Sequence, residues 1–270
     1  MSYYFKLIVE KILDIFGLKV IRKRKDLTLE TFLENIRNIG YYPKTIIDVG
    51  AAFGTFPLYE TFPDAFMLLV EPIQEWEQAL ENICRKYKGD YFIAAAGDKL
   101  GETVINVHED ITGSSVLKEV EGSSIDGSPR IVKVITLDQI CKAKNTAGPY
   151  LIKVDVQGAE LSVMDGVDYI LQETEIIILE VSLFKTMSTN PEIHDVLGYM
   201  KKKGFVTYDI FDFRYRPLDG ALSQLDIVFV KENGLFRQSH AFASPEQRKN
   251  MTHLAKSIVK KKMRGYQARL

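Results

Sequence analysis

The sequence predicts an α/β fold built on a doubly wound, seven-stranded, mostly parallel sheet with an antiparallel last strand. Three observations predict it. Short apolar runs alternate with helix-like segments from residue 45 onward, which is the pattern of a parallel sheet covered by helices on both faces. Two of these runs, at 45–49 and 150–154, lead into loops that hold an aspartate and then a glycine before a helix begins. The last two runs, at 205–211 and 225–230, are joined by a short polar loop, so we expect a terminal hairpin.

The composition indicates one α/β domain with extensions. Of the 270 residues, 46% are hydrophobic and 26% are charged, which is ordinary for a globular protein. The net charge of −1 conceals +4 in residues 1–26, −13 in residues 27–234 and +8 in residues 235–270. An acidic body does not favour nucleic acid as a substrate. The two cysteines, Cys84 and Cys141, lack metal-ligand spacing, which favours buried thiols and a cytoplasmic protein.

Residues 1–40 are expected to form a helical extension. Residues 3–16 place apolar side chains mostly on one face of a helix, and a second helix is expected over 27–39. Three roles stay open for the first helix. It could pack on the body or close over the site, contact a partner or a second copy in a homo-oligomer, or make peripheral membrane contact. No run reaches the ~18 apolar residues that a membrane span needs.

The sheet domain is expected over residues 41–232. Its strands are predicted at 45–49, 66–70, 91–95, 150–154, 176–181, 205–211 and 225–230, and its helices over 55–62, 73–87, 159–171 and 192–203. A β-rich insertion is expected at about 102–136, with strands at 103–107 and 131–135. Residues 233–270 form a basic tail with a helix over 244–264. Its lysines are expected to face solvent, and they offer a second route to membrane contact.

The first of the two loops indicates a cofactor. It reads Asp48-Val49-Gly50-Ala51-Ala52-Phe53-Gly54, and its small residues let the backbone approach a ligand closely. Because it is not G-x-G-x-x-G, the dinucleotide fingerprint is absent. Glu71 ends the second strand, where a carboxylate can accept hydrogen bonds from both ribose hydroxyls. Together with the terminal hairpin, these features favour S-adenosylmethionine (SAM) as the cofactor.

Motifs spread over about residues 40–232 then make the chain similar to one enzyme family. They are the loop 48–54, Glu71-Pro72, Thr136-Leu137-Asp138, the segment 152–160, Leu179-Glu180-Val181 and the segment 216–226. In this order they resemble the FkbM family. The resemblance implies a SAM-dependent methyltransferase of the Rossmann-like class I type, which methylates a hydroxyl of a sugar, glycan, glycolipid or other natural product. Ala52 stands where asparagine is frequent in the family, and Gln157 where glutamate is frequent.

Asp155, which follows the strand at 150–154, is predicted to lie nearest the chemistry. An alcohol is a weak nucleophile, so methyl transfer to a hydroxyl needs a group that accepts or orients its proton. Asp155 could do this, or it could contact the amino group of SAM. Glu180 ends the neighbouring strand, and the two carboxylates could converge to bind Mg²⁺ or Mn²⁺.

Further side chains have both a functional and a structural interpretation. Glu160 could hydrogen-bond the acceptor or favour the N-terminus of the next helix. Asp98 could reach the adenine amino group or begin a turn. Ser115 lies in a loop that is expected to fold over the cofactor, where it could bind the cofactor carboxylate. Arg214 and Arg216, on the hairpin loop, could bind an anionic acceptor such as a sugar phosphate or a uronic acid.

The sequence therefore predicts a SAM-dependent O-methyltransferase that acts on a small-molecule or glycan acceptor. Two alternatives stay open: a non-catalytic binding or scaffold protein on the same fold, and a metal-assisted O-methyltransferase acting on a natural product that is not a sugar. SAM binding without NAD binding would exclude a dehydrogenase.

Overall fold

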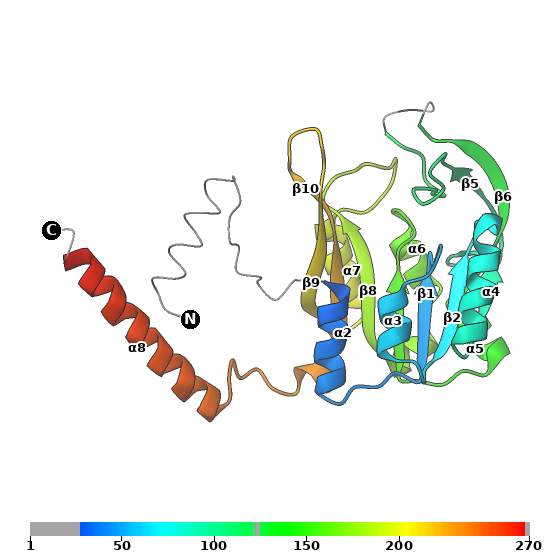
Figure 1. Ribbon diagram of the computed structural model, residues 1–270. Coiled ribbons are helices and arrows are strands. Elements are labelled where there is room, and N and C mark those ends of the chain that lie inside the picture. The colour runs from blue at the N-terminus through cyan, green and yellow to red at the C-terminus, as the bar shows by residue number, and fades with distance from the viewer. Residues whose placement is uncertain (1–27, 121, 123–124, 268–270) are drawn as a thin grey trace.

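The computed structural model describes residues 28–120, 122 and 125–267, and a seven-stranded sheet forms its centre (Figure 1). The strand order is β3-β2-β1-β7-β8-β10-β9. The strands are β1 (Thr45–Val49), β2 (Phe66–Glu71), β3 (Gly89–Ile93), β7 (Tyr150–Val154), β8 (Thr174–Ser182), β9 (Phe205–Tyr215) and β10 (Leu222–Lys231). The last strand, β10, is antiparallel to both β8 and β9, while the pairings among the other strands are parallel. The predicted fold class is confirmed.

Helices cover both faces of the sheet. One face packs against α2 (Leu29–Asn38), α3 (Phe56–Thr61) and α4 (Glu77–Lys86), and the other against α5 (Leu137–Lys144), α6 (Glu160–Asp165) and α7 (Ile193–Lys202). The central strands β1 and β7 are buried along their whole length, as their apolar sequences predict. Burial on both faces leaves only the strand ends open to a ligand.

The helices after β2 and β7 differ from the sequence expectation. The helix after β2 begins with a 3₁₀ turn, η1 (Gln74–Trp76), before α4. The helix expected over 159–171 stops at Asp165 and is followed by a separate turn, η2 (Ile170–Glu173). Gly166 marks the break, because a Cβ there would lie 2.2 Å from the carbonyl oxygen of Gly97. The sequence predicts a helix-like stretch around Cys141 without bounds, and the structure forms α5 there; Thr136 is the N-cap, and its side chain accepts a hydrogen bond from the backbone N–H of Gln139.

The insertion forms a second, three-stranded sheet beyond the carboxyl edge of the main one (Figure 1). Its order is β4-β6-β5, with β4 (Ala95–Ala96), β5 (Gly101–Val107) and β6 (Ser128–Ile135). Two isolated bridges fold the loop between β5 and β6 back on the domain. One joins Asn106 to Ser115, and the other joins Glu119 to Met187, in the segment that follows β8. The insertion therefore forms a wall beside the strand ends.

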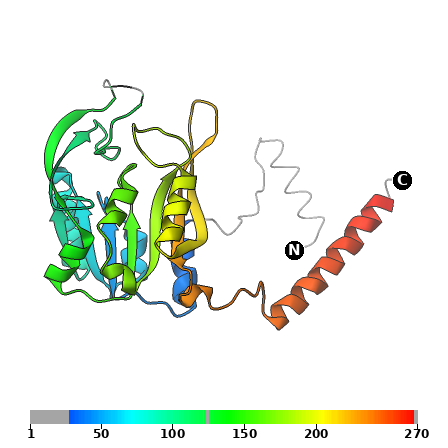
Figure 2. The same cartoon turned by 180° about the vertical axis from the view of Figure 1, so that it is seen from behind.

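The structure describes most of the C-terminal extension but not the first helix expected in the N-terminal one. The amphipathic helix expected over 3–16 lies outside the described residues. The tail holds a short turn, η3 (Leu235–Arg237), and then the helix α8 (Pro245–Gln267), which extends away from the sheet (Figures 1 and 2). Among the described residues, no helix is both long and apolar enough to cross a membrane.

Candidate active site

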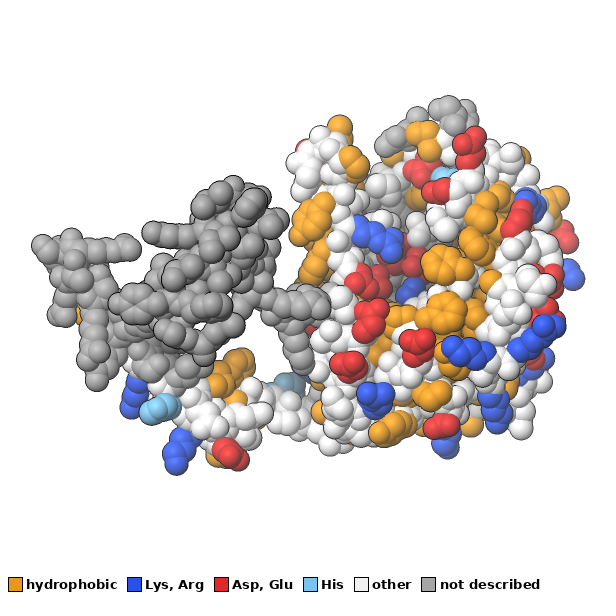
Figure 3. All heavy atoms as spheres, viewed as in Figure 1, with side chains coloured by type: hydrophobic (Ala, Val, Ile, Leu, Met, Phe, Trp, Pro, Cys, Tyr) orange, Lys and Arg blue, Asp and Glu red, His pale blue; other side chains and the backbone are white. Residues whose placement is uncertain are grey.

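A cavity of about 490 Å³ lies where β1, β2 and β7 end, and Figure 3 shows it as a hollow with acidic, basic and apolar side chains around it. Ligands of open parallel sheets bind at this edge. The lining comes from four segments: the loop after β1, the end of β2 with η1, the insertion, and the loop after β7. Arg214, on β9, completes it. The two loops singled out in the sequence therefore meet in one cavity.

Backbone geometry explains the small residues of the first loop. Gly50 and Gly54 have φ of +75° and +105°, a region that favours glycine. A Cβ at Gly50 would lie 1.8 Å from the carbonyl oxygen of Asp155, and one at Gly54 would lie 2.5 Å from the Cδ1 of Ile83. Ala52 has φ of +44°. Gly50, Ala51, Ala52, Phe53 and Gly54 all line the cavity, and their contact with a cofactor stays a prediction.

Asp48 is not among the described residues that line the cavity, which corrects its expected place at the cofactor. Its side chain is fully buried below the loop. It accepts hydrogen bonds from the backbone N–H of Thr55 at 3.3 Å, from the Thr55 hydroxyl at 3.2 Å and from the Tyr59 hydroxyl. Burial raises the pKa of this carboxyl, while Lys153 and these hydrogen bonds act in the other direction. Asp48 thus anchors the loop and the start of α3.

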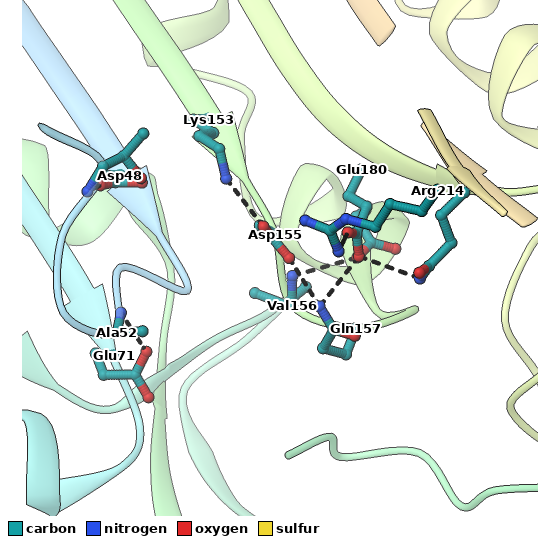
Figure 4. Close-up of polar contacts among 12 residues, drawn as sticks. Asp48, Ala52, Glu71, Lys153, Asp155, Val156, Gln157, Glu180 and Arg214 are labelled. Carbon is teal, nitrogen blue, oxygen red and sulfur yellow. Dashed lines mark hydrogen bonds and ion pairs between the residues drawn. The ribbon is translucent and has the colours of Figure 1, made fainter. Parts of the chain in front are cut away.

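Glu71 lines the cavity at the end of β2. Its carboxylate accepts hydrogen bonds from the backbone N–H groups of Ala52 and Ile73, both at 2.9 Å (Figure 4 draws the contact with Ala52). Burial raises the pKa of Glu71 to about 7, against the lowering effect of these two hydrogen bonds. Because each carboxylate oxygen can accept more than one hydrogen bond, Glu71 can still receive hydroxyl groups of a ligand.

On the other side of the cavity, a polar network joins β7, β8 and β9 (Figure 4). Lys153 donates to Asp155 at 3.0 Å. The side-chain amide of Gln157 donates to Asp155 at 2.9 Å and to Glu180 at 3.1 Å. Arg214 forms an ion pair with Glu180. The sequence predicted that Asp155 and Glu180 would converge, and a single nitrogen atom of Gln157 contacts both.

The network shifts the pKa values of its two carboxyl groups, Asp155 and Glu180, in opposite directions. Burial alone would raise the pKa of Asp155, but the charges of Lys153 and Arg214 and the hydrogen bonds from Lys153 and Gln157 outweigh burial and lower it. Burial and the negative charge of Asp155 raise the pKa of Glu180, although the charge of Arg214 opposes them. Asp155, which lines the cavity, is therefore the more acidic of the two carboxyl groups.

The residues present do not fit a magnesium site as they stand. Asp155 and Glu180 are already satisfied by Lys153, Arg214 and Gln157, which supply positive charge and N–H groups at the place a cation would take. Within the described part of the chain, no group of three or more His, Cys, Asp or Glu side chains is arranged to hold a metal ion.

The other predicted site residues divide between the cavity and its supports. Ser115 lines the cavity and donates from its hydroxyl to the carbonyl oxygen of Gln157 at 2.8 Å, so it ties the insertion to the loop after β7. Glu160 is buried and accepts from the backbone N–H groups of Val156 and Gly158, as a carboxylate that holds a turn does. Asp98 is exposed and lines an adjoining cavity of about 210 Å³, which shares Ala95, Ala96, Val116 and Ala159 with the first, so its contact with adenine stays a prediction.

Reasoning from the sequence assigned no role to Lys153 or Trp76, both of which line the cavity. Lys153 had a signal: a lysine within a buried apolar strand needs carboxylate partners. Trp76, whose ring lies 5.8 Å from that of Phe53, had none, because the turn that places it was expected to be ordinary helix.

Comparisons with known proteins agree with this geometry. The profile described as "Methyltransferase FkbM domain" matches residues 48–207. No curated protein matches the sequence.

Similar solved structures at low identity include two methyltransferases and a third protein in complex with AdoMet. The precorrin-6y C5,15-methyltransferase of Geobacter metallireducens is 9% identical, with a TM-score of 0.39 over 78% of this chain and 93% of that one. The magnesium protoporphyrin IX methyltransferase of Synechocystis PCC 6803 with bound SAH is 11% identical, with a TM-score of 0.40 over 84% and 99%. TYW2 of M. jannaschii in complex with AdoMet is 15% identical, with a TM-score of 0.35 over 76% and 77%.

Proposed function

The chain belongs to the FkbM methyltransferase domain family, and from that premise we propose that it is a SAM-dependent O-methyltransferase whose acceptor is a hydroxyl of a sugar, glycan or glycolipid. One observation carries the proposal. The glycine loop after β1, Glu71 and Asp155 line one cavity at the carboxyl edge of the sheet.

The cofactor half of the cavity suits an adenosyl amino acid. Gly50 and Gly54 line the cavity without side chains, so their backbone can approach the ligand closely. Glu71 is placed to accept ribose hydroxyls, and Ser114 and Ser115 face the same cavity from the insertion. When SAM is bound there, it supplies a methyl group on a sulfonium, which is electrophilic enough for direct displacement by an oxygen.

On the acceptor side, the chain provides orientation more than strong base catalysis. Lys153 and Gln157 fix both carboxylate oxygens of Asp155 by hydrogen bonds, so the side chain is held in one position. An ionised Asp155 accepts the hydrogen bond of the incoming hydroxyl and aligns its oxygen for in-line attack. The lowered pKa of Asp155 makes it a weak base. The proton of the acceptor hydroxyl is therefore expected to pass from Asp155 to solvent once the methyl group has been transferred.

The proposal is tested with SAM that carries tritium in its methyl group. The purified protein is offered neutral sugars, glycans, glycolipids and non-sugar alcohols, and label in a product is measured with and without EDTA. Label transferred to a carbohydrate hydroxyl that survives EDTA is the expected result. Label only in a non-sugar product, or only with added metal, would replace the proposal by the metal-assisted alternative. Binding of S-adenosylhomocysteine (SAH) without any labelled product would favour the scaffold alternative.

A further inference from the structure

The cationic side chains at the acceptor side of the cavity indicate which charge an acceptor can carry. Of the described residues that line the cavity, those that ordinarily carry charge are Glu71, Asp110, Lys153, Asp155 and Arg214. Both cations stand on the side of Asp155. A free lysine or arginine there would be the natural contact for a phosphate or carboxylate of the acceptor.

Lys153 is not free for such a contact. Its side chain is only 8% exposed, and its ammonium donates to Asp155 at 3.0 Å. Asp48 and Asp226, from the strands β1 and β10, act electrostatically on the same ammonium. The strand register brings these charges together. Asp48 on β1 lies beside Lys153 on β7, and Asp226 on β10 lies beside Glu180 on β8. The positive charge of Lys153 is therefore balanced within the sheet.

Arg214 is also balanced, although its side chain is 55% exposed and reaches the cavity. Its guanidinium pairs with Glu180, whose side chain is 3% exposed (Figure 4). Asp155, Asp226 and Asp212 act electrostatically on the same group. An anionic acceptor would have to compete with a buried carboxylate that cannot move into solvent.

The second arginine of the hairpin, Arg216, is occupied in the same way. It donates to Asp219 through two nitrogen atoms, one of them at 2.8 Å, and its guanidinium lies 3.9 Å from the centre of the Phe184 ring. The hairpin cations that the sequence suggested for an anionic acceptor are thus both paired with carboxylates.

We propose that the acceptor carries no negative charge at the end that enters the cavity, so that it is an uncharged hydroxyl-bearing group rather than a sugar phosphate or a uronic acid. The inference rests on the proposed function and narrows its substrate class. Lys153 is paired with Asp155 and Arg214 with Glu180, so neither cation of the cavity is free to bind an anion. Asp155 and Gln157, which line the cavity, supply acceptor oxygens for hydroxyl groups.

The test uses Glu180→Gln, which keeps the shape of the side chain and releases the charge of Arg214. Glucose 6-phosphate and its neutral counterpart, methyl α-glucoside, are titrated by calorimetry into the full chain, with and without SAH. We expect no measurable binding of glucose 6-phosphate to the wild type, and at least about tenfold tighter binding to Glu180→Gln. The double variant Glu180→Gln/Arg214→Gln is the matched control, and it should lose the gain.

Each result decides the matter. Wild-type protein that binds glucose 6-phosphate as tightly as Glu180→Gln does, or a Glu180→Gln variant without any gain, overturns the inference. If Glu180→Gln does not fold, the wild type decides alone through methyl transfer from labelled SAM. Faster labelling of an anionic sugar than of its neutral counterpart overturns the inference, and the reverse supports it. A failure of the proposed function gives a different result, because the wild type then binds no SAH and labels no product. The titration with glucose 6-phosphate in the absence of SAH still tests whether the cavity binds an anion.

Discussion

Gly50 packs directly against the main chain of Asp155, so that a Cβ on Gly50 would lie 1.8 Å from the Asp155 carbonyl oxygen. The two residues are a hundred positions apart in the chain and stand at the ends of the paired strands β1 and β7. This contact brings the cofactor loop and the acceptor loop together. It also means that neither loop can shift without the other.

The first prediction concerns Gly50→Ala. The substitution should lower the free energy of unfolding by about 3 kcal/mol or more, because it adds a steric clash to an unfavourable backbone conformation. Gly220→Ala is the matched control. Gly220 has nearly the same φ, +74° against +75°, but nothing within 4 Å of its Cβ position. It should lose only about 1 kcal/mol. Urea denaturation measures both, and equal losses would contradict the contact.

The second prediction concerns Glu71→Ala, which removes the carboxylate at the end of β2. SAH should bind about 30-fold more weakly, a loss of about 2 kcal/mol, because the ribose acceptor and the backbone contacts with Ala52 and Ile73 are lost together. Calorimetry measures the affinity. Trp76, the one tryptophan of the chain, lines the cavity and gives a second signal through its fluorescence.

Glu75→Ala is the control for Glu71. Glu75 lies four residues further on, is exposed, and pairs with Arg130 at 2.7 Å. It should leave SAH affinity unchanged. A Glu71→Ala protein that binds SAH as well as the Glu75→Ala protein would remove Glu71 from the cofactor site.

The third prediction concerns Asp155→Asn, which keeps the shape of the side chain and removes its charge. Turnover should fall about 100-fold or more, because the hydroxyl loses its charged hydrogen-bond acceptor, while SAH affinity should change little. Asp168→Asn provides the comparison, since Asp168 is exposed and pairs with Lys203. Full activity of Asp155→Asn would show that Asp155 is not the acceptor-orienting residue.

Local pattern was enough to predict the sheet, because strands such as β1 and β7 are continuous apolar runs that can only be buried. It was also enough to place Gly50 and Glu71 at the cavity, since both follow directly from the end of a strand. What it could not supply were contacts between distant segments. A Cβ on Gly166, the C-cap of α6, would lie 2.2 Å from the carbonyl oxygen of Gly97, and no residue near Gly166 in the chain indicates that contact.

The same limit explains the polar residues. Asp48 was expected to face the cofactor, but the position of Tyr59, one helix later, turns its carboxylate into the core. The pairing of Arg214 with Glu180 depends on β10 lying between β8 and β9, which fixes how far the hairpin reaches over the site. A local pattern indicates which residues carry charge, and the fold decides which charges remain available.

The last prediction concerns Asp226, a carboxyl buried in β10. Burial raises its pKa to about 7, although Lys153 opposes burial, whereas the ordinary value is 3.8. Between these two values the folded protein binds more protons than the unfolded chain, so its stability falls as the pH rises from about 4 to 7. Asp226→Asn removes this loss. It should stabilise the protein by on the order of 3 kcal/mol at pH 8 and by little at pH 4.

Thermal and urea unfolding of Asp226→Asn at pH 4 and pH 8 measure this difference, with the exposed Asp64→Asn as the comparison at both values. A gain that does not grow with pH would mean that Asp226 is ionised in the folded protein at little cost. If the stability gain of Asp226→Asn grows with pH and its methyl transfer is weaker, then the wild type keeps the Asp226 carboxyl at a cost in stability because activity needs it. Such a cost is expected where a charge serves the site rather than the fold.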